Sequence, residues 1–211
     1  MKIAVLGAGA MGSIYGGHLS TNNDVYMIDK KAELVDKINA DGLKLFENDT
    51  DVIYHPAALL SSEGIGEVDL VIIFVKALYS RAALMENKGI IGDNTYVMTL
   101  QNGAGHEDII LEFVPKERII IGTTEDNGAI LGDGYVRRGG KGKTNIGMKI
   151  HSICLIKLRS VLTLVDLIHT FMIISSSLYG TSCLLMFHLV LLQEFFRFQS
   201  DLSQQMNMHG I

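Results

Sequence analysis

The chain has 211 residues, enough for one large domain or for one domain and part of another. A formal net charge of −5 and a pI near 5.8 provide no positive field, so nucleic acid is not an expected partner. Cys154 and Cys183 are its two cysteines, which excludes a disulfide framework and a cysteine-based metal site. This composition fits a reducing, cytoplasmic setting, and we expect no bound metal.

A glycine-rich turn follows the first predicted strand, Lys2–Leu6. The six residues of this turn are Gly7, Ala8, Gly9, Ala10, Met11 and Gly12. In a G-x-G-x-x-G turn, the first glycine permits the tight turn and the second lets a pyrophosphate approach the backbone. The third allows close packing of the following helix, whose N-terminus binds the anion. The motif alone is a weak signal, because a strand–helix turn without a ligand carries the same glycines.

Strands and helices then alternate along the chain. Further strands are predicted at Asp24–Ile28, Leu43–Phe46, Val52–Tyr54, Val68–Val75, Tyr96–Leu100 and Arg118–Ile121. Helices are predicted at Lys31–Ala40, from Ala77 to about Lys88, and at Glu107–Phe113. The alternation predicts an α/β fold, a Rossmann-like doubly wound and mostly parallel sheet. Between Gly128 and Gly147, tight glycine turns join short segments that we expect to add antiparallel strands to the sheet edge.

The composition changes near Gly147. Residues 148–211 contain no alanine and no proline, and they hold five of the eight phenylalanines. We therefore expect a dinucleotide-binding domain over residues 1–147 and an atypical, poorly soluble apolar tail over residues 148–211. Three interpretations of the tail stay open: a frameshifted or truncated remnant, a membrane helix over Thr170–Leu192, or a buried or oligomerising helical segment.

Charged residues follow the second predicted strand, at the sheet edge where open α/β folds bind ligands. Asp29 stands 17 residues beyond Gly12, where such a unit often keeps an acid for the adenosine ribose 2′-hydroxyl. Lys30 and Lys31 come next, and their charges suit a 2′-phosphate. Asp29 therefore favours NAD and the lysine pair favours NADP, while a helix-capping role for Asp29 is the alternative.

Two more polar residues follow later strands. Lys76 directly succeeds the long apolar strand, where its ammonium can meet a carboxylate, a hydroxyl or a phosphate, although a strand-end lysine with an extended stem explains it equally. Asn102, in an Asn-Gly turn, is a candidate for a nicotinamide ribose or a substrate oxygen. His18 and His106 are expected to pack or to begin a helix rather than to act in catalysis.

In combination, these motifs resemble the ketopantoate reductase (2-dehydropantoate 2-reductase) family. The segments that carry the resemblance are Ile3–Gly12, Val75–Ala77, Gln101–Gly105, Gly132–Val136 and Ile146–Gly147. The resemblance implies a cytoplasmic, NADPH-dependent reduction of a small 2-keto acid, 2-dehydropantoate, to a 2-hydroxy acid in the pathway to pantothenate and coenzyme A. It implies that the glycine turn holds the pyrophosphate, that Lys30 meets the 2′-phosphate, and that Lys76 and Asn102 lie near the ribose and the substrate.

The resemblance ends before the family's second, helical domain, from which a lysine supplies the proton. No tryptophan-containing helix start followed by a lysine and asparagines is present, and Lys157 lies too soon after Gly147, so we assign no catalytic acid. Three functions stay open: a reductase whose catalytic domain is missing or scrambled, a nucleotide-binding module without catalysis, with or without membrane attachment through its tail, and another 2-hydroxy-acid or sugar-phosphate dehydrogenase. A homodimer is compatible with each.

Overall fold

The computed structural model describes residues 1–102, 105–140, 142–149 and 170–174. The chain divides into two compact units, Met1–Ile174 and Ser175–Ile211. The second unit lies wholly outside the described residues.

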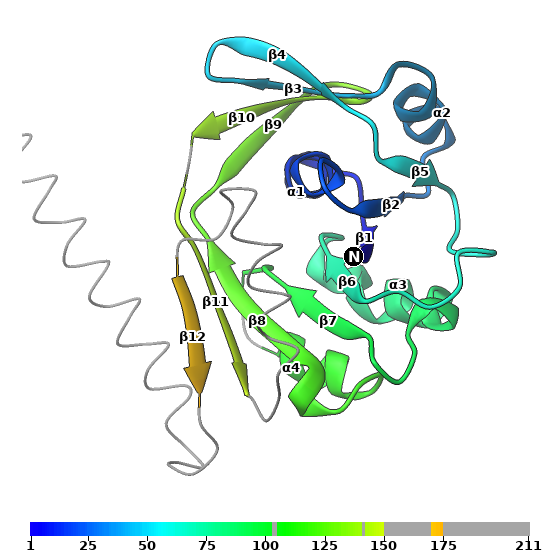
Figure 1. Cartoon of the computed structure of the whole chain (residues 1–211), viewed down its shortest axis with the longest axis vertical. Coiled ribbons are helices and arrows are strands. Elements are labelled where there is room, and N and C mark those ends of the chain that lie inside the picture. The colour runs from blue at the N-terminus through cyan, green and yellow to red at the C-terminus, as the bar shows by residue number, and fades with distance from the viewer. Residues whose placement is uncertain (103–104, 141, 150–169, 175–211) are drawn as a thin grey trace, which may run out of the picture. The chain divides into compact units, whose positions relative to one another are not determined.

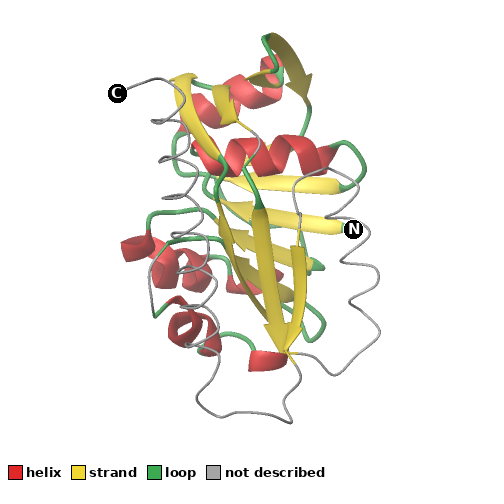
Figure 2. Cartoon of the chain, turned by 90° about the vertical axis from the view of Figure 1, so that its left-hand side faces the viewer, coloured by secondary structure: helices red, strands yellow, loops and turns green. Residues whose placement is uncertain are grey.

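The first unit is built on an eight-stranded sheet in the order β12-β11-β8-β7-β6-β1-β2-β5 (Figure 1, Figure 2). Its strands are β1 (Lys2–Leu6), β2 (Asp24–Ile28), β5 (Ala57–Leu59), β6 (Leu70–Ile73), β7 (Tyr96–Thr99), β8 (Ile119–Thr124), β11 (Thr144–Lys149) and β12 (Thr170–Ile174). Within this described sheet, neighbouring strands run parallel except at the β8–β11 pairing. The chain turns from β1 to β2 on one side and later to β6 on the other, so the crevice of a doubly wound sheet opens beside β1.

A four-stranded sheet in the order β4-β3-β10-β9 lies on one side of the main sheet, with α1 between the two (Figure 1). Its strands are β3 (Leu43–Glu47), β4 (Thr50–Tyr54), β9 (Asn127–Gly132) and β10 (Tyr135–Gly140). The helices are α1 (Ala10–Ser20), α2 (Ala32–Asp41), α3 (Ser80–Glu86) and α4 (His106–Leu111), with short 3₁₀ turns η1 (Ala77–Tyr79), η2 (Lys88–Ile90) and η3 (Lys116–Arg118). Helices α3 and α4 cover the opposite face of the main sheet.

The predicted Rossmann-like, mostly parallel sheet is confirmed, and β1 and β2 have the predicted bounds. The prediction for residues 128–147 is corrected in part. β11 does extend the main sheet, antiparallel to β8, but β9 and β10 do not. Instead β10 pairs parallel with β3, which draws the β9–β10 hairpin into the smaller sheet.

Two shorter features also differ from the sequence prediction. The expected helix from Ala77 to about Lys88 is divided into η1, α3 and η2. Strand β5, which pairs parallel with β2, was not predicted, because three residues are too few to show a period of two.

Strand β1 is buried on both faces and separates two cores. Ile3 and Val5 pack into the core on the α1 side, whereas Ala4 and Leu6 pack into the core below α3 and α4. All four residues of β6 are likewise buried. This double burial explains why these strands are continuous apolar runs rather than alternating ones.

Residues 148–211, predicted as an atypical tail, are described in two short pieces. β11 runs on to Lys149, and β12 pairs parallel with it. The other residues of the tail lie outside the described part, including Lys157 and the portion of the predicted Thr170–Leu192 span beyond β12. Within the described residues, no helix has the length and apolar character needed to cross a membrane.

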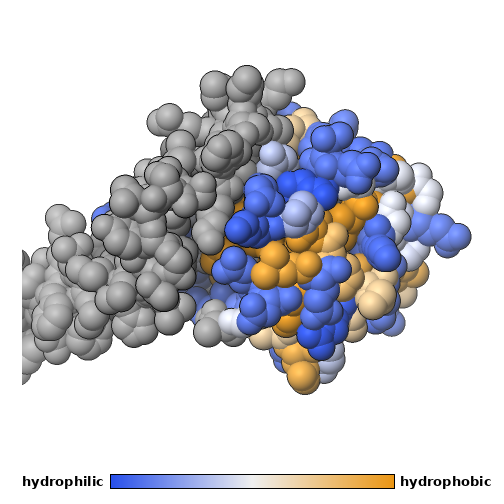
Figure 3. Space-filling model, turned by 90° about the horizontal axis from the view of Figure 1, so that it is seen from below, coloured by the Kyte–Doolittle hydropathy of each residue, from blue (hydrophilic) through white to orange (hydrophobic). Residues whose placement is uncertain are grey.

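Several large apolar side chains are exposed near the helices that cover the second core. Leu78 is 85% exposed, Met85 60% and Leu111 45%. Figure 3, seen from below the view of Figure 1, shows apolar surface bordered by hydrophilic residues. Exposed apolar residues are common on folded proteins, so these define no binding site on their own.

A buried ionic cluster joins the smaller sheet to the main one. Arg138 on β10 donates from Nε to both carboxylate oxygens of Asp126, at 3.1 and 3.0 Å, and from Nη2 to Oδ2. Its Nη1 lies 3.6 Å from Oε2 of Glu47 on β3. The side chains of Arg138, Asp126 and Glu47 are 4%, 1% and 9% exposed. One buried guanidinium thus compensates two buried carboxylates.

Helix α1 contributes to the same cluster. Glu47 accepts hydrogen bonds from Nε2 of His18, at 3.0 Å, and from the Tyr54 hydroxyl, at 2.9 Å. The Tyr15 hydroxyl meets Oγ1 of Thr124 at 3.1 Å and of Thr144 at 2.7 Å. The cluster therefore connects α1 to both sheets, and His18 is a packed histidine.

Removal of the Arg138 guanidinium is expected to destabilise the fold strongly. In Arg138→Leu, Asp126 and Glu47 stay buried without their cation, which should lower the free energy of unfolding by about 3–5 kcal/mol. Arg137→Leu, at the exposed neighbouring position on β10, is the matched control and should change it by less than about 0.5 kcal/mol. Urea unfolding measures both, and equal losses would contradict this role of the cluster.

A second prediction concerns pH. Burial lowers the pKa of His18 below its ordinary value, although the nearby Glu47 carboxylate acts in the opposite direction. The unfolded chain therefore takes up this proton at higher pH than the folded chain. The associated stability is present above about pH 6.5 and is lost as pH falls toward the folded pKa. Urea unfolding at several pH values should show a shallower loss in His18→Gln than in the wild type. His55→Gln, at an exposed histidine, should retain the wild-type slope.

Candidate functional site

The turn after β1 requires its first and third glycines. Gly7 has φ +99°, in the left-handed region, and its N–H donates to the carbonyl of Ile28 at 2.8 Å. A Cβ on Gly12 would lie 1.9 Å from the carbonyl oxygen of Gly7, a backbone atom that cannot move without opening the turn. α1 can therefore begin this close to β1 only with glycine at position 12.

Gly9 is different, because a Cβ there would meet nothing within 4 Å. Gly9 is also the N-cap of α1, where no side chain caps the helix and no acid stands in the first turn. The first N–H groups of the helix, at Ala10, Met11 and Gly12, thus face a space without a carboxylate from this helix. This cradle fits a pyrophosphate, which needs backbone donors and close approach.

Asp29, at the end of β2, binds the glycine turn directly. Its Oδ2 accepts from the N–H of Ala8 at 2.8 Å, and its Oδ1 accepts from the N–H of Lys31 at 3.0 Å. Lys31 is the N-cap residue of α2, so Asp29 precedes the cap. Each carboxylate oxygen has a second lone pair, so Asp29 retains the capacity to accept a ribose hydroxyl.

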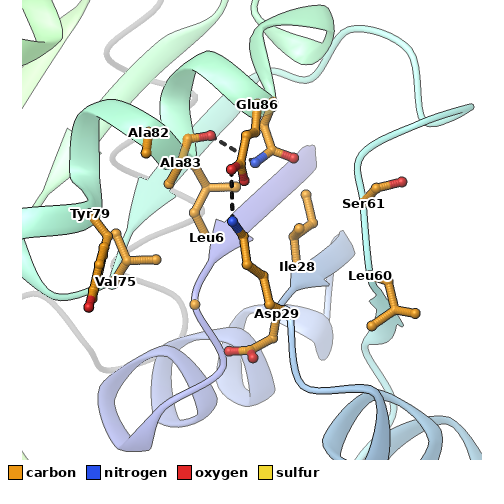
Figure 4. Close-up of a pocket in the computed structure, with 13 residues that line it drawn as sticks. Leu6, Ile28, Asp29, Leu60, Ser61, Val75, Tyr79, Ala82, Ala83 and Glu86 are labelled. Atoms are coloured by element: carbon orange, nitrogen blue, oxygen red, sulfur yellow. Dashed lines mark hydrogen bonds and ion pairs between the residues drawn. The ribbon is translucent and has the colours of Figure 1, made fainter.

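A cavity of about 310 Å³ opens beside Asp29, between the ends of β1 and β2 and helix α3 (Figure 4). Leu60, Val75 and Tyr79 contribute apolar wall, and Lys30 and Glu86 contribute charge. A cavity of this size, with an apolar wall for a flat ring and a carboxylate at one end, suits the adenosine part of a dinucleotide.

Both lysines after Asp29 are paired with acids. Nζ of Lys30 lies 2.7 Å from Oε1 of Glu86 on α3, and Nζ of Lys31 lies 2.6 Å from Oδ1 of Asp133 in the β9–β10 turn. The hydrogen bond to Asp133 raises the pKa of Lys31. A 2′-phosphate would therefore have to compete with a carboxylate for either ammonium.

Lys76 and Asn102 follow the adjacent strands β6 and β7 at the same edge of the sheet. Both residues are exposed, and neither side chain has a hydrogen-bond or ion-pair partner among the residues that the structure describes. A Cβ on Gly7 would lie 2.9 Å from the N of Val75, so the glycine turn approaches the segment that carries Lys76. The structure thus gathers the sequence-predicted residues at one edge.

Gln101 and His106 support this edge of the sheet. This supporting role was not predicted from the sequence for either residue. Gln101 donates from Nε2 to the carbonyl of Val75 and to Oγ of Ser80, the latter at 3.0 Å, which ties the Lys76 segment to the end of β7. His106 Nε2 donates to the carbonyl of Asn102 at 3.1 Å. The signals in the sequence are the place of Gln101 in the Gln101–Gly105 segment of the family resemblance and the proximity of His106 to Asn102. In the described part of the chain, no three His, Cys, Asp or Glu side chains gather as metal ligands would.

The fold and the site define a Rossmann-like α/β domain with a glycine-rich turn at the carboxyl edge of its sheet. The family profile described as ketopantoate reductase PanE/ApbA matches residues 3–149. The chain therefore belongs to the ketopantoate reductase family, whose members are nucleotide-dependent reductases that act on a keto acid.

Curated relatives also match about 70% of the chain. The 2-dehydropantoate 2-reductase of Streptococcus pyogenes serotype M1 is 35% identical over 147 residues, which are 69% of this chain and 48% of the relative. The enzyme of that name from Halobacterium salinarum is 32% identical over 149 residues, 70% of this chain and 49% of the relative. The chain thus spans about half the length of the curated relatives it matches.

Solved structures share the fold. The 2-dehydropantoate 2-reductase from Geobacter metallireducens has a TM-score of 0.72 at 26% identity, over 82% of this chain and 58% of its own. A ternary structure of D-mandelate dehydrogenase with NADH and anilino(oxo)acetate has a TM-score of 0.73 at 36% identity, over 84% of this chain and 57% of its own.

Alanine at Gly12 should destabilise the fold, whereas alanine at Gly9 should leave its stability nearly unchanged. Gly12→Ala forces a Cβ onto the Gly7 carbonyl and should cost roughly 2 kcal/mol or more, or prevent folding. Gly9→Ala enters open space at an ordinary φ of −68° and should retain the wild-type Tm within a few degrees. Thermal denaturation followed by circular dichroism compares them, and equal losses would refute this account of the turn.

Proposed function

We propose that residues 1–147 form the nicotinamide-dinucleotide domain of an NADPH-dependent reductase that converts 2-dehydropantoate, a 2-keto acid, to its 2-hydroxy acid. The observation that carries the proposal is the meeting of the glycine turn, Asp29, Lys76 and Asn102 at one sheet edge, in a chain 35% identical to 2-dehydropantoate 2-reductases over that domain. NADH is the alternative cofactor, because Asp29 suits a 2′-hydroxyl.

Different residues along the sheet edge bind different parts of the cofactor and the substrate. Backbone donors of residues 7–12 hold the pyrophosphate, and Asp29 and Lys30 meet the adenosine ribose with its 2′-phosphate. Lys76 and Asn102 hold the second ribose and the keto acid, since an ammonium suits the carboxylate and an amide can donate to a carbonyl oxygen. When bound, the reduced nicotinamide supplies the hydride.

Ketone reduction also needs a group that stabilises and protonates the developing alkoxide. We propose that this acid belongs to a second, helical domain, as the family resemblance implies, and no residue of this chain is assigned to it. The family match ends at residue 149, so nucleotide binding is the firmer part of the proposal. A nucleotide-binding module without catalysis is the second candidate, because no catalytic acid is assigned.

The setting follows from the same proposal. A small-molecule keto acid is the expected partner, in the cytoplasm and without nucleic acid. The remnant, membrane and helical interpretations of the tail, and a homodimer, stay predictions.

Titration of the full chain with NADPH, followed by nicotinamide fluorescence, tests the proposal. We expect saturable binding by the wild type and at least about tenfold weaker binding by Gly9→Ala, because its Cβ occupies the space needed for a pyrophosphate. NADPH oxidation that depends on 2-dehydropantoate distinguishes a reductase from a non-catalytic module. Absence of binding by a folded wild-type chain would falsify both.

A further inference from the structure

The ion pair between Lys30 and Glu86 joins two walls of the adenosine cavity. Lys30 directly follows Asp29 at the end of β2, and Glu86 is the last residue of α3. In Figure 4 the dashed line below the Glu86 carboxylate marks its ion pair with Lys30, and Asp29 lies on the side of the glycine turn. Lys31, the other nearby lysine, pairs with Asp133, which does not line the cavity. Lys30 is therefore the lysine placed to act within the cavity.

We propose that Glu86 is a specificity-determining residue, which sets the preference between NADPH and NADH by holding the Lys30 ammonium. The inference rests on the proposed function and assigns a role to a residue outside the glycine turn and the strand ends. Its ligand is the substituent on the adenosine 2′-oxygen, either a hydroxyl or a phosphate.

The two nucleotides place different demands on this pair. A 2′-phosphate carries a charge of about −1.5 to −2, and it would have to share the Lys30 ammonium with the Glu86 carboxylate or displace that carboxylate. The Glu86 carboxylate then remains nearby as a like charge. A 2′-hydroxyl needs only an acceptor, which Asp29 offers while the Lys30–Glu86 pair stays intact. The pair thus disfavours NADPH and leaves NADH unaffected.

Solvent limits the size of this effect. The Lys30 and Glu86 side chains are 78% and 51% exposed, so the pair is weak enough for a phosphate to break. Glu86 accordingly shifts the ratio of the two affinities without abolishing either.

Titration of the full chain with NADH and with NADPH, followed by calorimetry, tests the inference. Glu86→Gln retains the shape of the side chain and frees Lys30, so it should tighten NADPH binding by roughly three- to tenfold and change NADH binding by less than about twofold. Lys30→Gln should weaken NADPH selectively. In the double variant the gain from Glu86→Gln should disappear, because it acts through Lys30.

The matched control is Glu112→Gln. Glu112 forms a similarly exposed ion pair with Arg81, at 2.6 Å, and neither residue lines the cavity. It should change neither affinity. If Glu86→Gln leaves the affinity ratio unchanged, or tightens both nucleotides equally, the inference is overturned while the proposed function stands. If the folded wild type binds neither nucleotide, both are overturned.

Discussion

The position of α1 is the constraint on which the rest of the described structure depends. This helix lies between two sheets, and its approach to β1 is so close that position 12 has no room for a Cβ beside the Gly7 carbonyl. On the other side of α1, Gly17 permits close packing against the smaller sheet. A Cβ there would lie 3.2 Å from side-chain atoms of Leu45 and Tyr54. The short distance at the start of α1 keeps its free N–H groups beside the ends of β1 and β2. Packing and the anion site are therefore consequences of the same contacts.

The ionic cluster holds the other end of α1, and its formation costs the hydration of the buried charges. A buried Arg138 with two buried carboxylates stabilises the fold little compared with apolar packing, since each charge gives up its hydration. Such a cluster is directional, however, because Nε and Nη2 of the guanidinium both donate to the Asp126 carboxylate while Nη1 lies beside Glu47. It fits only one placement of β10 against β3 and α1. Apolar contacts provide most of the burial, and the cluster selects the arrangement.

The sequence predicted the main sheet well because its signals are local. The runs at Lys2–Leu6 and Asp24–Ile28 are apolar after a charged first residue and end at turn residues, and the structure gives them the same bounds. The strands of the smaller sheet also lie in segments that were predicted as strands, but their assembly into a separate sheet has no local signal. β3 and β10 pair in parallel although about 90 residues separate them, and such a pairing depends on packing against α1. The sequence of β10 also does not reveal that Arg138, rather than Arg137, is the buried arginine. Successive side chains of a strand point to opposite faces, so one of the two arginines is buried whichever face packs inward.

In the candidate site, too, the positions of the residues could be predicted from the sequence, but their contact partners could not. Asp29, Lys30, Lys76 and Asn102 could be selected because each follows a predicted strand, and parallel strands end at one edge. Their partners come from elements distant in the chain. Ala8 occupies one oxygen of Asp29, and Glu86, 56 residues away, holds Lys30. Such partners cannot be read from the strand ends, which is why two adjacent lysines and an aspartate left the choice between NAD and NADP open.

These contacts also separate binding from catalysis. The glycine turn, Asp29 and the cavity beside it are formed by residues from Leu6 to Asn87, within the segment that the family profile matches. Holding a pyrophosphate and an adenosine needs only this edge of the sheet. In the proposed reaction the alkoxide also needs an acid to protonate it, and we assign that acid to a second, helical element rather than to this sheet edge. Under that proposal, one edge of the sheet binds the nucleotide, and the chemistry depends on a group from another element.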